Sequence, residues 1–110
     1  MDNTTIEAGK PLAIVSYLTI IGTIIAFYSN NETKNPFTLF HVKQALGLWL
    51  TFFLLGYFIG YLNSLNVTFA FWIAIGSLII YGVIGAISGK LNAVPVLGPF
   101  YQKLFKSLGN

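Results

Sequence analysis

The sequence predicts an all-α membrane protein with three transmembrane helices, and two observations support this fold class. Residues 44–89 contain no charged residue and no histidine. As a helix rising about 1.5 Å per residue, this run would extend roughly 70 Å, or about two crossings of a ~30 Å hydrocarbon core. In the chain of 110 residues, 55% are hydrophobic and only 8% are charged, whereas soluble domains carry about 25% charged residues.

The first expected span covers residues 11–28. This uncharged stretch is about 18 residues long, close to the shortest helix that crosses a bilayer. Pro11 suits the first turn of a helix, where a backbone N–H is not needed. A cleaved signal peptide is the alternative, and it is disfavoured because no small-x-small cleavage site follows Tyr28.

Two further spans follow a polar break at residues 29–35. Pro36 opens the next segment, and we expect residues 37–43 to form an interfacial helix that continues into a second span at residues 45–62. Asn63, Ser64 and Asn66 are strong turn formers, so a tight turn should precede the third span at residues 67–88. Gly89 and Lys90 end that span.

The C-terminal tail has two expected parts. Residues 91–98 should be irregular, because Pro95 and Gly98 interrupt regular structure. Residues 99–108 should form an amphipathic helix that lies in the membrane interface. Its expected apolar face consists of Phe100, Tyr101, Leu104, Phe105 and Leu108.

The lysines predict an orientation. All six basic residues are lysines. With three spans, the N-terminus and the turn at residues 63–66 share one side, which holds Lys10 alone, and the other five lysines lie opposite. The positive-inside rule then predicts an external N-terminus and a cytoplasmic C-terminus in a bacterial inner membrane. Because the lysines flank apolar spans, we expect them to meet anionic lipid headgroups rather than nucleic acid.

Small residues should hold the helices together, since apolar side chains gain little by leaving lipid. The second span contains Gly56 and Gly60 in a GxxxG pattern. This pattern is compatible with a packing seam inside the chain or with an interface to a second copy or another subunit.

The residues offer little chemistry. The sequence has no cysteine, one histidine and three acidic residues, and all three acids lie in polar ends or loops. A catalytic triad, a metal site or a paired-carboxylate site cannot be assembled from this set, so we expect neither an enzyme nor a cofactor.

One polar cluster stands out at the start of the second span. At helical spacing, Phe37, Phe40, His41 and Gln44 share a face, and His41 and Gln44 can reach the same neighbour. Three interpretations are open: hydrogen bonds to backbone groups of helix ends or the tail loop, a binding role toward a partner or headgroup, or pH sensing by His41.

The same segment carries a resemblance to a known family. Residues 37–45 read Phe-x-x-Phe-His-x-x-Gln-Ala, a pattern that resembles a bacterial family of small three-span membrane proteins labelled "import component protein". That family is in turn similar to the small inner-envelope subunit of the chloroplast Tic protein-import machinery. Further matching stretches are Ser-Tyr-Leu-Thr at residues 16–19, Tyr-Gly-x-x-Gly-Ala at residues 81–86 and Pro-x-Leu-Gly-x-x-x-Gln-Lys-x-Phe-Lys at residues 95–106.

The resemblance extends over residues 10–106 and implies a link to protein transport. It adds Pro95, Gly98, Gln102 and Lys103 to the candidate interaction residues. Two function classes follow. The first is a non-enzymatic accessory or structural subunit of a larger inner-membrane assembly, with other integral membrane subunits as partners. The second is a self-assembling pore or small-solute transporter, which would be a homo-oligomer.

Overall fold

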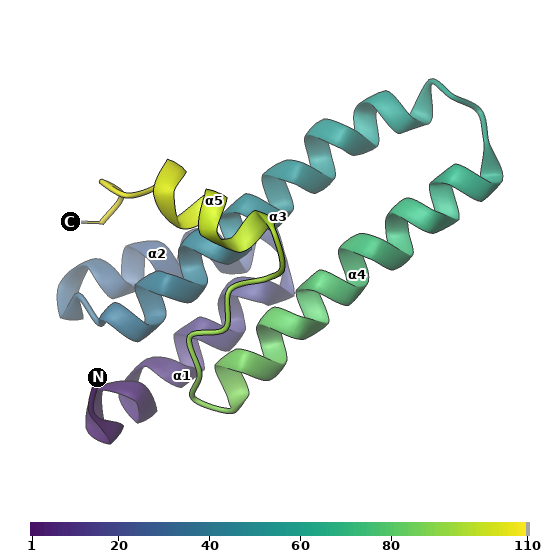
Figure 1. Cartoon of the computed structure of the whole chain (residues 1–110). Coiled ribbons are helices and arrows are strands. Elements are labelled where there is room, and N and C mark those ends of the chain that lie inside the picture. The colour runs from purple at the N-terminus through teal and green to yellow at the C-terminus, as the bar shows by residue number, and fades with distance from the viewer. Residues whose placement is uncertain (110) are drawn as a thin grey trace.

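The computed structural model describes residues 1–109 and consists of five helices, with no strand in that range (Figure 1). The all-α prediction is therefore confirmed. The helices are α1 (Asn3–Leu18), α2 (Ile20–Thr33), α3 (Pro36–Gly60), α4 (Leu65–Ile87) and α5 (Leu97–Leu104). Two of them, α3 and α4, are long and apolar enough to cross a membrane.

Local sequence explains where these helices begin. The Asp2 carboxylate accepts a hydrogen bond from the backbone N–H of Thr5 at 2.8 Å, and this bond holds the pKa of Asp2 below its usual range. The Asn35 side chain accepts from the N–H groups of Phe37 and Thr38, directly before Pro36 at the first turn of α3. Ser64 caps α4 by accepting from the N–H of Val67.

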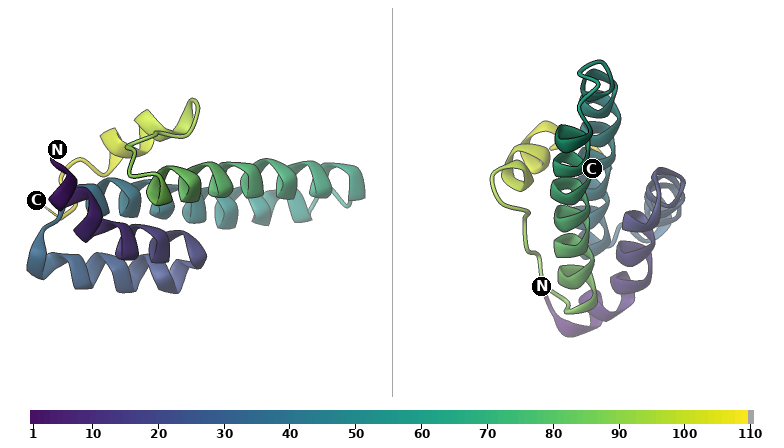
Figure 2. Two further views of the ribbon diagram at one scale, coloured as in Figure 1. Left: turned by 90° about the horizontal axis from the view of Figure 1, so that it is seen from below. Right: turned by 90° about the vertical axis from the view of Figure 1, so that its right-hand side faces the viewer.

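The single helix predicted over residues 11–28 is wrong, because the chain reverses at Thr19. This residue has extended backbone angles, φ −156° and ψ 170°, and separates α1 from α2. The two helices then lie side by side as an antiparallel hairpin (Figure 2). With 16 and 14 residues they are about 24 and 21 Å long, so neither alone matches a ~30 Å hydrocarbon core. Among the described helices, only α3 and α4 therefore have the length and apolar composition of a span.

Two threonines stabilise this reversal. The Thr19 hydroxyl accepts from the N–H of Gly22 at 3.1 Å and so caps α2. The Thr23 hydroxyl donates to the carbonyl oxygen of Ser16 at 2.6 Å, which links the two arms of the hairpin across the turn. Gly22 is required by the close approach, since a Cβ there would collide with the carbonyl oxygen of Val15.

The third predicted span, residues 67–88, falls within two residues of both ends of α4. The second, residues 45–62, ends two residues beyond α3 but begins nine residues after the start of that helix. Residues 37–43 are helical and continue into the second span, as predicted. They are the first turns of α3, which continues without a break from Pro36 to Gly60.

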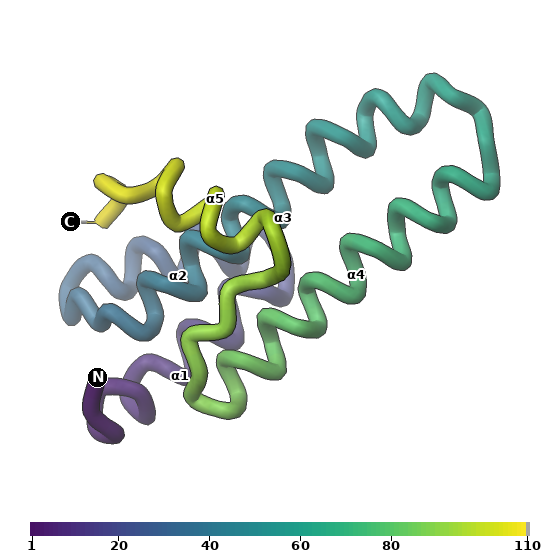
Figure 3. The backbone as a smooth tube through the Cα atoms, viewed as in Figure 1, coloured from purple at the N-terminus to yellow at the C-terminus, as the bar shows by residue number. Residues whose placement is uncertain are grey.

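Burial divides the molecule into two parts. At one end, which we call the base, α1, α2 and α5 pack on the first half of α3, and α1 also packs on the last half of α4 (Figures 1 and 3). Beyond the base, α3 and α4 continue as what we call the outer hairpin, residues 49–74, which α5 contacts near its start through Thr51 and Tyr101. No residue of the outer hairpin is buried, whereas α3 is buried almost continuously from Phe37 to Leu48.

The tail matches its prediction only in part. The expected helix at residues 99–108 is observed as α5, which begins two residues earlier and ends at Leu104. Its apolar side chains do not share one environment. Tyr101 is 2% exposed and packs toward α3, whereas Phe100 and Leu104 are more than half exposed.

Candidate functional site: a buried polar network in the base

The predicted pair on α3 forms a network with Tyr17 of α1. The Tyr17 hydroxyl lies 2.6 Å from Nδ1 of His41 and 2.9 Å from Nε2 of Gln44. The expectation that His41 and Gln44 reach one common neighbour is therefore confirmed. Both side chains are 0% exposed and Tyr17 is 1% exposed, so the network is enclosed by the base.

The partners of the network fix its proton positions. Nε2 of His41 lies 2.9 Å from the backbone carbonyl oxygen of Lys90, which can only accept, so Nε2 carries the proton. Nδ1 must then accept from the Tyr17 hydroxyl, and the hydroxyl oxygen accepts from the Gln44 amide. This neutral tautomer leaves no ring nitrogen of His41 without a partner.

Gln44 extends the network to the loop after α4. Its Nε2 donates to the carbonyl oxygen of Asn92 at 3.1 Å, and its Oε1 accepts from the N–H of Val94 at 2.8 Å. Together with the bond from His41 to Lys90, these contacts hold residues 90–94 against α3. Backbone groups of helix ends or the tail loop were one expected set of partners. Asn92 and Val94 lie in that loop, and Lys90 lies just before it.

Aromatic rings surround the imidazole of His41. Its ring centroid lies 4.8 Å from that of Phe37, 5.2 Å from that of Phe40 and 5.5 Å from that of Tyr17, all in edge-to-face arrangements. Phe37 is fully buried and Phe40 is half-buried. The two phenylalanines of the sequence pattern therefore form part of the wall around the histidine.

A glycine on α4 makes room for the tyrosine. A Cβ at Gly82 would stand 2.5 Å from Cε1 of Tyr17, too close for any real side chain. The next glycine on the same face, Gly85, would place its Cβ 3.5 Å or more from its neighbours, which is ordinary contact. Gly82 is thus needed for the close approach of α1 and α4.

The tail residues of the resemblance take different positions. Gly98 is buried, and a Cβ there would meet Ala93 at 2.6 Å. Gln102 donates to the carbonyl oxygen of Phe40 at 2.9 Å and so ties α5 to α3. Pro95 and Lys103 are exposed.

A second row of contacts on α3 holds α5 in place. The hydroxyls of Thr51 and Tyr101 lie 2.5 Å apart, and Gly47 leaves space for the Tyr101 ring. Lys43, 8% exposed, directs its ammonium to the carbonyl oxygen of Lys106 at 3.5 Å, just beyond the C-terminus of α5. A cation is favourable there because it opposes the negative end of the helix dipole.

The GxxxG glycines lie far from this network, in the outer hairpin. A Cβ at Gly56 would lie 3.6 Å from the ring of Phe71, and Gly60 has no neighbour within 4 Å. These two glycines therefore do not form a tight seam between α3 and α4. Both line an open groove of about 380 Å³ between the helices, whose walls include Phe52, Phe71 and Trp72.

The network links separate parts of the chain, and the polar atoms of His41 and Gln44 all have hydrogen-bond partners within the protein. Over residues 1–109, one buried side-chain polar atom lacks a hydrogen-bond partner, Nε1 of Trp49. No three histidine, aspartate or glutamate side chains in that range gather in a metal-binding arrangement. Its observed contacts are structural: α1, α3 and the loop at residues 90–94 meet on three side chains.

Sequence reasoning missed several of these residues. Tyr17 stood in the Ser-Tyr-Leu-Thr stretch, but nothing in its local pattern pointed to His41. Thr51, Gly47 and Lys43 were likewise not connected to the tail. The signal that could have found Tyr17 is its place two residues before Thr19, the residue that caps α2, because a reversal there keeps Tyr17 at the level of α3 residues 41–44.

The comparisons with known proteins found no matching family model, no matching curated protein and no matching solved structure.

Proposed function

We propose that the chain is a membrane protein whose long helices span the bilayer while the α1–α2 hairpin enters it from one side and returns. The exposed surface supports this proposal. In the most apolar stretch of each long helix, only 33% of α3 and 11% of α4 is buried. A core helix of a soluble protein would be mostly buried, so these apolar faces require lipid or a partner.

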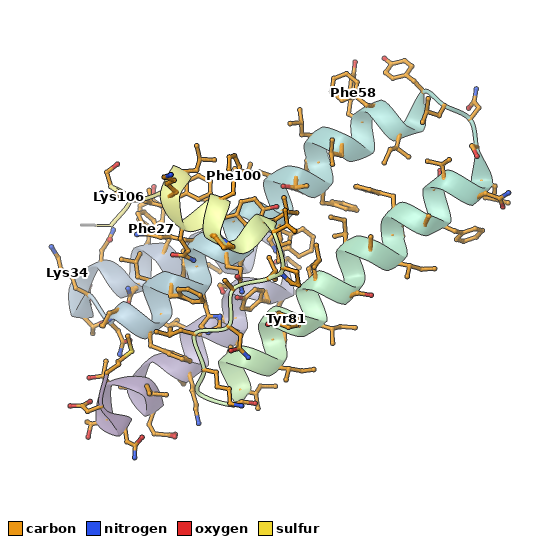
Figure 4. The ribbon with its side chains drawn as sticks, in the orientation of Figure 1. Phe27, Lys34, Phe58, Tyr81, Phe100 and Lys106 are labelled. Carbon is orange, nitrogen blue, oxygen red and sulfur yellow. The ribbon has the colours of Figure 1, made fainter. Side chains whose placement is uncertain are left out.

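The charges support one orientation for this arrangement. All six lysines belong to the base, and the outer turn at residues 61–66 carries no charge. Figure 4 shows Lys34 and Lys106 at the base and Phe58 on the outer hairpin. The positive-inside rule then favours a cytoplasmic base, with both termini in the cytoplasm of a bacterial inner membrane and lysines near anionic headgroups. This replaces the external N-terminus, which depended on three spans.

Cysteine labelling tests the topology, because the sequence contains no cysteine. Asn3→Cys and Ser107→Cys lie at the base, and Asn66→Cys lies at the outer turn; all three positions are exposed. In intact spheroplasts, a membrane-impermeant maleimide should label only Asn66→Cys. The two base positions should react only after permeabilisation. Labelling of Asn3→Cys in intact spheroplasts would contradict the hairpin topology.

We further propose that the protein is a non-enzymatic accessory subunit of a larger membrane assembly, linked to protein transport through the resemblance described above. The observation that carries this proposal is the contrast between the two parts. In the base, polar groups are satisfied within the chain. The outer hairpin has an open groove lined by aromatic side chains. Gly60 lies in its lining, and the space beside this glycine is empty. Small residues let a neighbouring transmembrane helix approach closely, so the groove suits a helix of another subunit.

Substitution of Gly60 tests the subunit role. Gly60→Leu should leave folding unchanged, since a Cβ there would meet no side chain and no backbone of another element within 4 Å, but should block a partner helix. Gly76→Leu is the matched control, because Gly76 also has no neighbour within 4 Å and does not line the groove. After gentle detergent extraction, a different protein that co-purifies with the native chain and with Gly76→Leu, but not with Gly60→Leu, supports the proposal.

The same experiment separates the alternative. A self-assembling pore would give a complex that contains only copies of this chain on size exclusion and mass spectrometry. A native chain that runs as a monomer without any partner would contradict both functions.

A further inference from the structure

We infer that the chain is a wedge in the bilayer, which widens the leaflet beside the base and favours a membrane that is convex on that side. The inference rests on the proposed topology. It concerns the shape of the protein toward lipid, which the subunit role does not require. Three features carry it: the uneven cross-section, the lipid-facing surface of the short hairpin, and the contacts that fix that hairpin in place.

The cross-section changes halfway along the molecule. Helix α1 lies alongside the first half of α3. Three hydrogen bonds join the two segments: Asn35 to Thr5 at 2.8 Å, Thr38 to Gly9 at 2.9 Å and Gln44 to Tyr17 at 2.9 Å. The α1–α2 turn then ends this layer near the middle of α3 and α4 (Figure 2). Beyond it, only the two helices of the outer hairpin remain.

The depth of the wide part follows from helix geometry. Lys10 lies beside Gly89 at the end of α4, so both mark the level of the headgroups. From there, residues 11–18 of α1 reach about 12 Å into a core of about 30 Å. One leaflet therefore holds α1 and α2 beside α3 and α4, together with α5, which packs on α3 between Lys43 and Thr51. Most of the other leaflet holds α3 and α4 only. The helices α1 and α2 alone, each of about 10 Å diameter, add about 160 Å² of cross-section to the first leaflet.

The surface of the short hairpin fits acyl chains. Its large apolar side chains point outward at and after the turn, where a soluble protein would be polar. The exposed members are Leu18 at 63%, Ile21 at 65%, Ile24 at 48%, Ile25 at 52% and Tyr28 at 67%. No charged residue lies between Lys10 and Glu32. The hairpin therefore displaces lipid from its leaflet instead of lying above it.

The wedge is also fixed in place. The hairpin cannot leave the leaflet without breaking the buried bonds from Tyr17 to His41 and Gln44 and from Thr38 to Gly9. A partner helix in the outer groove would add about 80 Å² to the narrow side and reduce the difference in cross-section. The curvature preference thus belongs to the free chain and weakens when that groove is filled.

Vesicles of two sizes test this inference. The full-length chain, as Ser107→Cys or Asn66→Cys, is reconstituted without partners into small and large unilamellar vesicles of phosphatidylcholine and phosphatidylglycerol. We call a molecule base-out when its base faces the outside of the vesicle and base-in when its base faces the lumen. External labelling with an impermeant fluorescent maleimide counts base-out molecules in the Ser107→Cys variant and base-in molecules in the Asn66→Cys variant. We expect base-out molecules to be about twofold or more denser per membrane area on small vesicles, and base-in molecules to be denser on large ones.

The opposite sign for the two orientations is the decisive result. Equal densities on both vesicle sizes, or the same preference for both orientations, would overturn the wedge. A chain with both Asn3→Cys and Ser107→Cys checks the underlying topology in the same vesicles. If each molecule is labelled at both positions or at neither, the topology holds and a negative size result refutes only the wedge. If single labelling predominates, the topology is wrong, and the wedge falls with it.

Discussion

Replacement of Gln44 by methionine should strongly destabilise the fold, because this amide makes three hydrogen bonds. Its partners are the Tyr17 hydroxyl, the Asn92 carbonyl oxygen and the Val94 N–H. Methionine keeps the length and the apolar stem but removes the donors and acceptor. Hydrogen bonds contribute about 1 kcal/mol each in soluble proteins and about 0.6 kcal/mol in membrane proteins. The loss of three should therefore lower the free energy of unfolding by about 2–3 kcal/mol.

Gln102→Met is the matched control. The substitution is the same, but Gln102 makes a single hydrogen bond, to the carbonyl oxygen of Phe40. Its expected loss is about 0.6–1 kcal/mol. Both variants can be measured in mixed micelles by titration with sodium dodecyl sulfate, with helical circular dichroism as the signal. Equal losses for the two variants, or a loss for Gln44→Met below that of Gln102→Met, would refute the assignment of the network as the main clamp.

Two further predictions concern the same network. His41→Phe keeps the ring and removes the bond to Lys90, so limited trypsin digestion in detergent should cleave after Lys90 or Lys103 faster than in the native chain; unchanged cleavage would mean that His41 does not hold the tail. Gly82→Ala should lower the free energy of unfolding by about 1–3 kcal/mol because its Cβ overlaps the Tyr17 ring, whereas Gly85→Ala, with ordinary contacts only, should lie within about 0.5 kcal/mol of the native value in the same titration. A Gly82→Ala variant as stable as Gly85→Ala would show that α1 is not packed as described.

The long helices could be predicted from sequence because the length of an uncharged apolar run sets the length of the helix that it forms. The uncharged run fixed α3 and α4 to within two residues at most of their ends, apart from the first turns of α3. The same property failed at residues 11–28, since a single span and two shorter antiparallel arms have identical hydropathy. The reversal depends on Thr19, Gly22 and Thr23, none of which breaks a helix by residue type alone.

Only the α3 residues of the site could be predicted from the sequence. Helical spacing on α3 brought His41 and Gln44 together and indicated a shared partner. The identity of that partner required the path of α1, because Tyr17 reaches the pair only if the chain turns back at Thr19. A continuous first span would have carried α1 past this level. The error in the fold and the missed residue in the site thus have the same cause.

The network also constrains the order in which the molecule can be completed. Tyr17 belongs to the first segment synthesised, whereas Gly82, Lys90, Asn92 and Val94 emerge from the ribosome near the end. Until then, Tyr17, His41 and Gln44 lack their partners on α4 and in the loop after it. Final packing of the N-terminal hairpin must therefore wait until α4 and the loop after it are in place. Truncation before residue 90 should therefore disturb the N-terminal part more than its distance in sequence suggests.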